Sequence, residues 1–374
     1  MKVLICSPYL DISGVVSGGV NQWGRYMVSY YNEFGKVDVD LILSSFDRYL
    51  YLSSGDVPTW KRIWNGIEEQ GSAVVKAKKL MKEEKPDVVH ICTSAGLGLI
   101  KDLLLIKAAK SIGAKTAVHL HFGRTPELLN HNNWESKLIQ RVLSSCDVAI
   151  AMNQPTMDAL KEHGYSNARY LPNPLSLSII NQVKELEGTI KRIPNQILYV
   201  GHVARTKGVY ELVEACTKIS GVKLRIVGKC PDVDKENLLK VAGSTNETSW
   251  IEIVGEVSHD QVLREFFEAG IFVFPSYSEG FPNVILEAMA CGCPIASSNV
   301  GAIPEMLDID GDACGICFKP KSPEEVYQAI SSLIDNDEMK TSFAAKAKAR
   351  VNKLYAIPQV WGQMINIWNQ SIEK

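Results

Sequence analysis

The amino-acid sequence predicts an α/β protein with two domains, each built on a doubly wound parallel sheet. Three observations lead to this prediction. The chain has 374 residues, which is too long for one core of ordinary size. Short apolar runs alternate with helical patterns in both halves, which is typical of strand–helix–strand units. Between the halves, Pro, Asn and Ser interrupt the pattern in "YLPNPLSLSIINQV", so we expect an interdomain linker at 171–192.

The first half contains five apolar runs that we predict as strands, with helical patterns between them. We expect this domain to span residues 1–175. Its strands are predicted at 2–9, 37–45, 86–94, 115–123 and 147–153, and its helices at 20–34, 72–85, 98–112, 135–145 and 155–163.

The second half repeats this alternation without a detectable sequence repeat. We expect the second domain to span residues 193–355, followed by a final amphipathic helix at 356–374. The predicted strands are 196–203, 223–230, 251–257, 271–277, 294–299 and 315–320, and the predicted helices are 207–219, 234–243, 259–268, 282–291, 323–335 and 337–353.

The composition excludes several classes of protein. Hydrophobic residues at 46% and charged residues at 22% fit a globular chain, and the net charge of −2 gives no reason to expect nucleic acid as a partner. The nine cysteines are scattered among apolar neighbours without nearby histidines, so we interpret them as buried fillers rather than zinc ligands. The start "MKVLICSPYL" lacks a signal-peptide pattern and no apolar run approaches the ~20 residues of a membrane span, so we expect a cytoplasmic protein.

One segment, "FPSYSEGFPNVILEAMACGCPIA", places two carboxylates in apolar surroundings. Burying an unpartnered carboxylate is very costly, so Glu287 needs a solvent face, a protein partner or a ligand. Its neighbours on one helix face are Asn283, Val284, Ala290 and Cys291, which do not form a solvated stripe. A ligand is therefore the favoured interpretation, and the solvent face remains an alternative.

The start of the same helix suits a phosphate. Pro282 is a favoured first-turn residue, and the N–H groups that follow Glu279-Gly280-Phe281 lie at the positive end of the helix dipole. Glu287 lies roughly 8 Å further along at 1.5 Å per residue. If a diphosphate bound at the helix start, one carboxylate would lie near each end of the molecule that carries the diphosphate. One carboxylate would accept hydrogen bonds from a ribose diol and the other from a hexose hydroxyl. This arrangement predicts a nucleotide sugar as ligand.

The whole segment resembles the donor-binding region of family 4 glycosyltransferases, which are retaining enzymes of the GT-B fold. The family's mark is two glutamates with seven residues between them, followed by a Gly-Pro pair and a Gly-x-x-Glu turn. Here these are Glu279 and Glu287, Gly292/Cys293/Pro294, and Gly301–Glu305 with one extra residue. The resemblance implies two Rossmann-like domains that face a cleft, with the C-terminal helix packed back on the first domain.

Other segments extend the resemblance along most of the chain. "LYVGHVARTKGVYELVEA" is similar to the family's diphosphate-binding loop, with Gly201 and Lys207 in place; His202 stands where the family has Arg, so we transfer that role to Arg205. "SGGVNQWGRYM" resembles its glycine-rich loop, with Gly18 and Gly19. In "VHLHFGR", His121 matches the family's active-site histidine, and His119 is an alternative match.

The resemblance implies transfer of a hexosyl unit from a nucleoside-diphosphate sugar, by default a UDP-sugar, with retention. The catalytic residues would be His121, Glu279, Arg205 and Lys207. The donor site would also contain Gly18, Gly19, Gly201, Gly280, Phe281, Pro282, Asn283, Val284 and Glu287. Because Arg205, Lys207 and the helix dipole supply positive charge, we expect neither a metal nor a cofactor. The alternatives are a nucleotide-sugar epimerase of the same fold and a non-catalytic sugar-nucleotide binding protein.

The acceptor is expected to be a saccharide or a lipid-linked saccharide in bacterial surface polysaccharide synthesis. Residues 1–178 carry a net charge of +3 and the remainder −5, and the positive charge is densest in "VVKAKKLMKEEK" and in "RYLYL" and "WKRIW". These segments predict peripheral association with an anionic membrane surface. A solvated helix face is the alternative.

Overall fold

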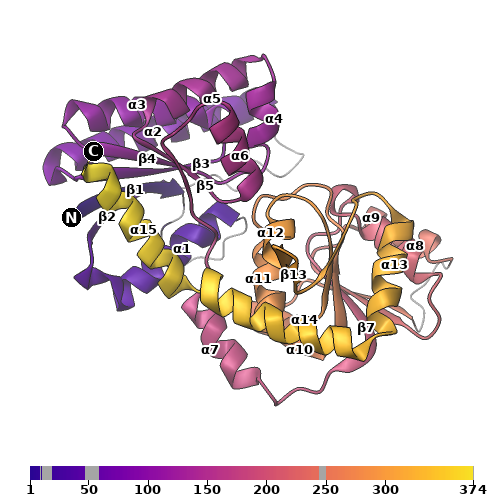
Figure 1. The fold of residues 1–374 in the computed structure, drawn as a ribbon. Helices are drawn as coiled ribbons and strands as arrows, with labels where there is room; N and C mark the ends of the chain where they lie inside the picture. The colour runs from indigo at the N-terminus through magenta and orange to yellow at the C-terminus, as the bar shows by residue number, and fades with distance from the viewer. Residues whose placement is uncertain (9, 11–18, 47–58, 244–249, 374) are drawn as a thin grey trace. The chain divides into compact units, whose positions relative to one another are not determined.

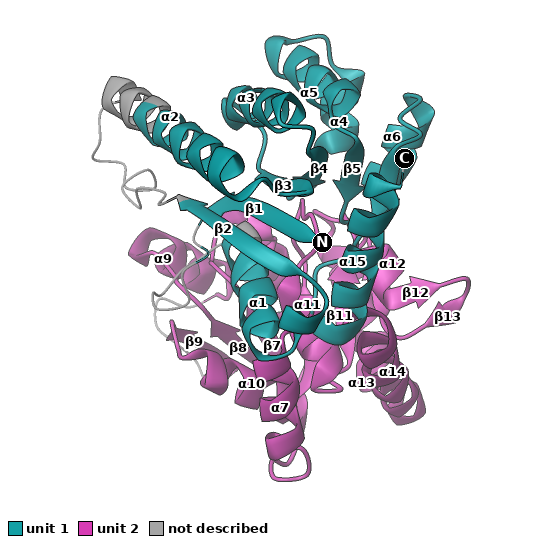
Figure 2. Ribbon diagram, turned by 90° about the vertical axis from the view of Figure 1, so that its left-hand side faces the viewer, with its two compact units in different colours: residues 1–174, 357–374 teal, residues 175–356 magenta. Residues whose placement is uncertain are grey.

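The structure is a computed structural model, and it describes the chain apart from residues 9, 11–18, 47–58, 244–249 and 374. The chain forms two compact units, which are residues 1–174 with 357–374 (unit 1) and residues 175–356 (unit 2) (Figure 2). Each unit contains one six-stranded parallel sheet with helices packed against it (Figure 1). The α/β class and the two parallel sheets predicted from the sequence are confirmed.

The sheet of unit 1 has the strand order β2-β1-β3-β4-β5-β6. Because β1 lies between β2 and β3, the chain reverses its direction of winding between β1 and β3. All five predicted strands are present, and the short β6 was not predicted. The bounds are β1 Lys2–Pro8, β2 Asp40–Phe46, β3 Val88–Thr93, β4 Lys115–Leu120, β5 Val148–Ala151 and β6 Ala168–Tyr170.

The helices of unit 1 cover both faces of this sheet. On β3, Val89 and Ile91 pack into a core with α2, α3 and α5, whereas His90 on the opposite face contacts the rings of α1 and α15. Helix α2 begins at Thr59 instead of 72, and α4 was not predicted. The bounds are α1 Gly19–Glu33, α2 Thr59–Glu84, α3 Gly98–Ser111, α4 Thr125–Asn130, α5 Trp134–Ser145, α6 Gln154–Glu162 and α15 Ile357–Ile372, with a 3-10 helix at Gly35–Val37.

The C-terminal helix α15 belongs to unit 1. Its two tryptophans donate hydrogen bonds into that unit, from Trp361 Nε1 to Asp38 Oδ2 at 3.0 Å and from Trp368 Nε1 to His90 Nδ1 at 3.1 Å. Both indoles are almost fully buried. Buried indole N–H groups need acceptors, so these two bonds tie α15 to the sheet.

The sheet of unit 2 has the strand order β14-β11-β10-β7-β8-β9. The winding reverses between β7 and β10, so this pair of strands is the topological switch point of the unit. The bounds are β7 Ile193–Val200, β8 Lys223–Val227, β9 Ile251–Gly255, β10 Ala269–Phe274, β11 Ile295–Ser298 and β14 Ile316–Phe318, with a separate hairpin of β12 Asp308–Ile309 and β13 Asp312–Ala313.

The helices of unit 2 correct the sequence prediction in three places. The expected linker at 171–192 contains helix α7, because Ser176 caps it through Ile179 N at 3.3 Å. Gly208, in the left-handed region, divides the helix expected at 207–219. Pro282 caps α11 instead of starting it. The bounds are α7 Leu177–Leu186, α8 Val209–Cys216, α9 Asp232–Val241, α10 His259–Glu268, α11 Asn283–Ala290, α12 Ile303–Leu307, α13 Pro323–Ile334 and α14 Asp337–Arg350, with a 3-10 helix at Arg205–Lys207 and a π-helical turn at Val351–Tyr355.

Among the described residues, no helix combines the length and the apolar character needed to span a bilayer.

Candidate active site

The first glutamate of the motif lies at the carboxyl edge of the unit 2 sheet. Glu279 is in the loop that follows β10, and the loop that follows β7 lies against it, with Tyr277 N donating to Thr206 O at 2.9 Å. These two strands form the topological switch point, where open α/β sheets bind their ligands. Strand order thus brings the predicted cation loop and the predicted carboxylate loop to the place where a ligand is expected.

Lys207 and Glu279 form an ion pair between these two loops. Lys207 Nζ lies 2.6 Å from Glu279 Oε1, and the side chains are 33% and 14% exposed. This short N–H···O distance is typical of a charge-assisted hydrogen bond. The cation predicted for the diphosphate and the carboxylate predicted for the hexose are therefore direct neighbours.

Two glycines allow the backbone to approach closely around this pair. Gly208 has φ +69°, and a Cβ there would lie 2.0 Å from Pro275 O. Gly301 has φ +56°, and a Cβ there would lie 2.3 Å from Glu279 O. Both positions require glycine for conformation and for space. The turn at Gly301, which the sequence motif includes, thus supports the loop that carries Glu279.

Arg205 is the more exposed of the two predicted cations. Its side chain is 68% exposed, its NH2 lies 3.7 Å from Glu211 Oε1, and its guanidinium lies over the Tyr210 ring at 4.7 Å. Glu211 also accepts a hydrogen bond from Tyr277 Oη at 2.6 Å, and burial, with this carboxylate beside it, raises the pKa of Tyr277 to about 12. The guanidinium is exposed to solvent and lies 3.7 Å from the carboxylate, so this contact holds Arg205 weakly and Arg205 can turn toward a ligand at small cost.

Glu287 is buried, and its partner is a histidine. The residue is only 6% exposed, so the solvent-face alternative is wrong. Glu287 Oε1 lies 3.1 Å from Nε2 of His259, the first residue of α10. The sequence analysis did not identify His259; its only local signal is its place directly after the capping residue Ser258.

The carboxylate and the helix end act in opposite directions on His259. The hydrogen bond with Glu287 raises the pKa of His259 against the effect of burial. A cation at a helix N-terminus loses about 0.3–1 kcal/mol to the dipole. A hydrogen bond to a charged group contributes about 1.5–3 kcal/mol, so the carboxylate prevails.

The remaining predicted donor residues of unit 2 lie directly after β7 and around the start of α11. Gly201 directly follows β7, and its N–H donates to Val227 O of β8 at 2.9 Å. Asn283 and Val284 form the first turn of α11 and are half-buried, after Gly280 and Pro282. The Phe281 ring is buried against Tyr355, with centroids 5.6 Å apart, so this side chain belongs to the core of unit 2.

In unit 1, His121 directly follows β4, and its backbone N–H donates to Thr93 O at 2.9 Å. It belongs to a three-histidine cluster of His90, His119 and His121. The Trp23 ring packs against all three imidazoles, with its centroid 5.3 Å from that of His90, 4.9 Å from that of His119 and 5.0 Å from that of His121. His119, the alternative match, is fully buried, whereas His121 is 9% exposed.

Burial determines the charge of this cluster. Desolvation, and then the neighbouring His90, lowers the pKa of His121 to about 3, and desolvation lowers the pKa of His90 to about 3. His121 is therefore a neutral imidazole at physiological pH and offers hydrogen bonds instead of charge. Of the predicted glycine pair nearby, Gly19 starts α1 and Gly18 lies outside the described residues.

Two of the Asp-x-Asp triplets of unit 2, a pattern that can bind metals, contain an aspartate with a structural role. In 308–310, Asp308 Oδ1 accepts from Gly311 N at 2.9 Å within the β12–β13 hairpin. In 232–234, Asp234 Oδ1 accepts from Tyr210 Oη at 2.7 Å. No group of three or more His, Cys, Asp or Glu with metal-binding geometry occurs among the residues described.

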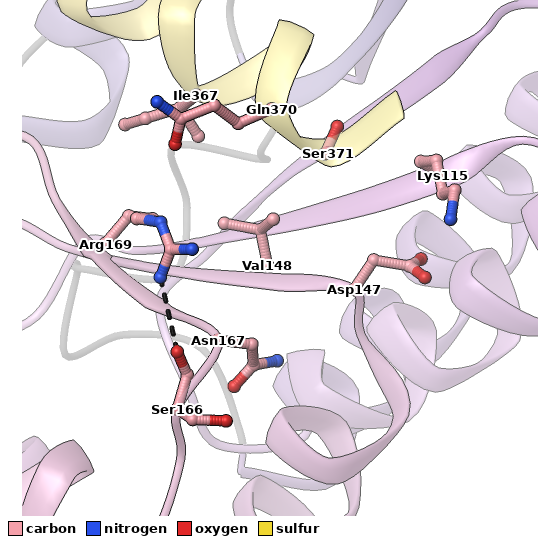
Figure 3. Close-up of a pocket in the computed structure, with 9 residues that line it drawn as sticks. All are labelled: Lys115, Asp147, Val148, Ser166, Asn167, Arg169, Ile367, Gln370 and Ser371. Carbon is pink, nitrogen blue, oxygen red and sulfur yellow. Dashed lines mark hydrogen bonds between the residues drawn. The ribbon is translucent and has the colours of Figure 1, made fainter. Parts of the chain in front are cut away.

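A pocket of about 240 Å³ opens at the other edge of the unit 1 sheet (Figure 3). It is lined by Lys115, Asp147 and Arg169, at the amino ends of β4, β5 and β6, and by Ser371 of α15. Asp147 Oδ2 is held by Thr116 N at 2.8 Å and Thr116 Oγ1 at 2.6 Å. Catalytic groups of such sheets lie at the carboxyl ends of strands, so this pocket is not the candidate active site.

Solved structures show the same fold over the whole chain. Sucrose-phosphate synthase from Thermosynechococcus elongatus matches with a TM-score of 0.72 at 19% identity, covering 99% of this chain and 98% of that one. Anabaena HepE in complex with UDP matches with a TM-score of 0.70 at 16% identity, covering 99% of this chain and 100% of that one. The fold class is therefore GT-B, with two Rossmann-like units.

Sequence comparison identifies the family. The family model described as "Glycosyltransferase Family 4" matches residues 17–178, and the model described as "Glycosyl transferases group 1" matches residues 185–350. Together these models span most of the chain, and the protein belongs to the family 4 glycosyltransferases. The family predicted from the glutamate motif is confirmed.

The curated relatives are distant. The putative teichuronic acid biosynthesis glycosyltransferase TuaC of Bacillus subtilis is 26% identical over 70% of this chain and 64% of its own length. An uncharacterized glycosyltransferase of Methanocaldococcus jannaschii is 26% identical over 93% of this chain and 92% of its own. An N-acetylgalactosaminyltransferase of Campylobacter jejuni that acts on a diphospho-undecaprenol-linked saccharide is 24% identical over 65% of this chain and 67% of its own. The chain thus spans just under two thirds of the length of TuaC.

Proposed function

We propose that the protein transfers a hexosyl unit from a nucleoside-diphosphate sugar to an acceptor hydroxyl, with retention at the anomeric carbon and without a metal ion. The observation that carries this proposal is the meeting of Arg205, Lys207 and Glu279 at the switch point of unit 2. Cations suit a diphosphate there, and a carboxylate suits sugar hydroxyls. UDP is the proposed nucleotide, in keeping with the UDP bound in the HepE structure.

Each of these residues has a distinct role in the proposed site. Arg205 and Lys207 bind the diphosphate, Glu279 accepts hydrogen bonds from the hexose, and Glu287 accepts them from the ribose. The buried position of Glu287 favours this role, because a carboxylate in low dielectric bonds strongly to a hydroxyl. Neutral His121 hydrogen-bonds the donor sugar and takes no part in proton transfer.

The reaction follows from these roles. The bond between the anomeric carbon and the diphosphate oxygen breaks, and negative charge grows on the leaving phosphate, where Lys207 and Arg205 stabilise it. The acceptor oxygen attacks the anomeric carbon from the same face as the leaving group. Its proton passes to the departing phosphate oxygen, so atoms and charge balance and the anomeric configuration is retained.

A lipid-linked saccharide is the proposed acceptor, which agrees with the activity for which the Campylobacter relative is named. In unit 1, helix α3 and its N-cap residue expose the apolar side chains of Leu97, Ile100 and Leu104, which are 52%, 47% and 43% exposed. Their spacing places them on one face of the helix. Helix α2 lies beside α3 (Figure 2). It carries four exposed lysines, which are Lys76, Lys78, Lys79 and Lys82.

This apolar and basic surface fits an anionic membrane, where each lysine contributes about 1 kcal/mol, screened by salt. The predicted segments "RYLYL" and "WKRIW" lie outside the residues whose side chains are described. Co-sedimentation with anionic vesicles at low salt tests the surface, with Ile100→Ser/Leu104→Ser as the variant and the exposed Val233→Ser of unit 2 as control. Equal binding to neutral and anionic vesicles, or none to either, contradicts it.

A thermal-shift screen against UDP-glucose, GDP-mannose and ADP-glucose tests the proposed activity first. A nucleotide sugar at 100 times its dissociation constant adds about 2.7 kcal/mol of stability. Transfer to a diphospho-undecaprenol-linked saccharide is then measured in excess EDTA, with incubation of donor alone as control. A loss of transfer that magnesium or manganese restores contradicts metal independence. Conversion of the donor without acceptor identifies an epimerase instead.

A further inference from the structure

His259 is the protein partner of the buried Glu287, and it is placed by local structure. Ser258 Oγ accepts from Gln261 N at 3.3 Å, which starts α10 and fixes His259 as its first residue. Helices α10 and α11 pack against each other, so His259 Nε2 reaches Glu287 Oε1 at 3.1 Å. The side chain of His259 is 42% exposed, whereas that of Glu287 is 8% exposed. The imidazole therefore connects solvent with a buried carboxylate.

The other charged groups near His259 are few. Asp260, on the same helix, adds negative charge and is itself held by Gln182 Nε2 of α7 at 3.1 Å. Strand β10 carries no ionisable side chain, and Tyr199 of β7 donates its hydroxyl to His202 O at 3.0 Å. Arg192 binds the carbonyls of Phe266 and Ala269 at the other end of α10. Glu287 is thus the group that determines the protonation of His259.

Orientation of a carboxylate matters for a ribose diol. Two adjacent hydroxyls demand a defined direction of the acceptor lone pairs, and a side chain with three rotatable bonds does not supply this alone. A hydrogen bond to Oε1 restricts that rotation. A protonated imidazole makes this bond stronger than a neutral one does.

We propose that His259 is a positioning residue of the donor site, which holds the Glu287 carboxylate for the ribose and makes nucleotide affinity depend on pH. This inference rests on the proposed function. His259 does not touch the reacting atoms and acts through Glu287. Because the pairing with Glu287 raises the pKa of His259 and so favours the protonated imidazole, affinity is highest at low pH and falls as pH rises through that raised pKa.

Calorimetric titration at pH 6.0, 7.0 and 8.5 tests the proposal, using the nucleotide sugar that the thermal-shift screen selects. These donors suit the test because their diphosphate is a diester and does not titrate in this range. In the parent protein the dissociation constant should rise about three- to tenfold between pH 6.0 and 8.5. His259→Gln should abolish this dependence and raise the Michaelis constant with turnover nearly unchanged.

Three further variants separate positioning from general damage. Glu287→Gln should weaken binding at every pH, and adding His259→Gln to it should cause no further loss, because the histidine acts only through the carboxylate. The exposed His131, replaced in His131→Gln, should leave both affinity and pH dependence as in the parent.

The outcomes distinguish this inference from the proposed function. A parent protein that binds none of the three nucleotide sugars refutes both. A parent that binds, together with a His259→Gln protein of the same affinity and pH dependence, refutes only the role of His259. NMR titration of the imidazole gives a ligand-free measurement: Glu287→Gln should lower the pKa of His259, and an unchanged pKa overturns the pairing.

Discussion

The three-histidine cluster of unit 1 should make the protein sensitive to acid, and His119→Leu should relieve part of that sensitivity. His90, His119 and His121 are all buried, and no hydrogen-bond partner is found for either ring nitrogen of His119 within the described part of the chain. Burial lowers the pKa of His90 and His121 to about 3 and that of His119 well below its usual value. In the unfolded chain these groups titrate near 6.5.

The sign of the effect follows from proton binding. Below pH 6.5 the unfolded chain takes up protons that the folded protein does not, so the free energy of unfolding falls as pH falls. Stability is thus full above pH 6.5 and is lost progressively down to about pH 3. Each histidine removes at most about 1.4 kcal/mol per pH unit, which is about 2 kcal/mol between pH 7 and pH 5.

Three histidines together remove about 6 kcal/mol over this range, which is comparable with the whole stability of many domains. His119→Leu should reduce the loss by about a third. At pH 7.5 this variant should be as stable as the parent or more stable, because an unpartnered buried polar group costs about 1–3 kcal/mol.

Urea unfolding at pH 7.5, 6.0 and 5.0 measures this, followed by tryptophan fluorescence. Six of the seven tryptophans lie in the residue ranges of unit 1, so the signal reports on the unit that contains the cluster. The exposed His131 provides the control His131→Gln, which should follow the parent. A His119→Leu protein that loses stability with falling pH as steeply as the parent refutes the reasoning.

Three further predictions concern residues of unit 2. Glu287→Gln should weaken binding of both the nucleotide sugar and the free nucleoside diphosphate. Glu279→Gln should leave nucleoside diphosphate binding intact or stronger, since it releases Lys207 from its ion pair. It should raise the activation free energy of transfer by about 2–4 kcal/mol and so lower turnover roughly 30- to 1000-fold. Calorimetry measures nucleotide binding and steady-state kinetics measures turnover for both variants. If Glu279→Gln abolishes nucleotide binding and Glu287→Gln does not, the roles assigned to the two glutamates are reversed. Gly208→Ala should cost about 2–4 kcal/mol in urea unfolding, because its Cβ would lie 2.0 Å from Pro275 O at a positive φ. The control Gly221→Ala has φ +75° and no atom within 4 Å, so it should cost only about 1–2 kcal/mol, and equal losses would contradict the steric argument.

The sequence by itself determined the strands. All eleven predicted strands are present, because a parallel strand buried on both faces is a continuous apolar run that can be recognised without its neighbours. The short elements escaped prediction. Strand β6, helices α4 and α12 and the β12–β13 hairpin have between two and six residues each. Such elements are too short to show the hydrophobic periodicity of a helix or a strand, and contacts from elsewhere in the chain hold them.

The sequence also determined where the two glutamates stand along the chain, one in a loop and one in a helix almost free of polar residues. It did not determine what they touch. Lys207 is 72 residues from Glu279, and His259 is 28 residues from Glu287. The first pair exists because β7 and β10 are neighbours in the sheet, and the second because α10 packs against α11. Side-chain pattern is a local property, whereas the partner of a buried charge depends on strand order and helix packing, which only the tertiary structure decides.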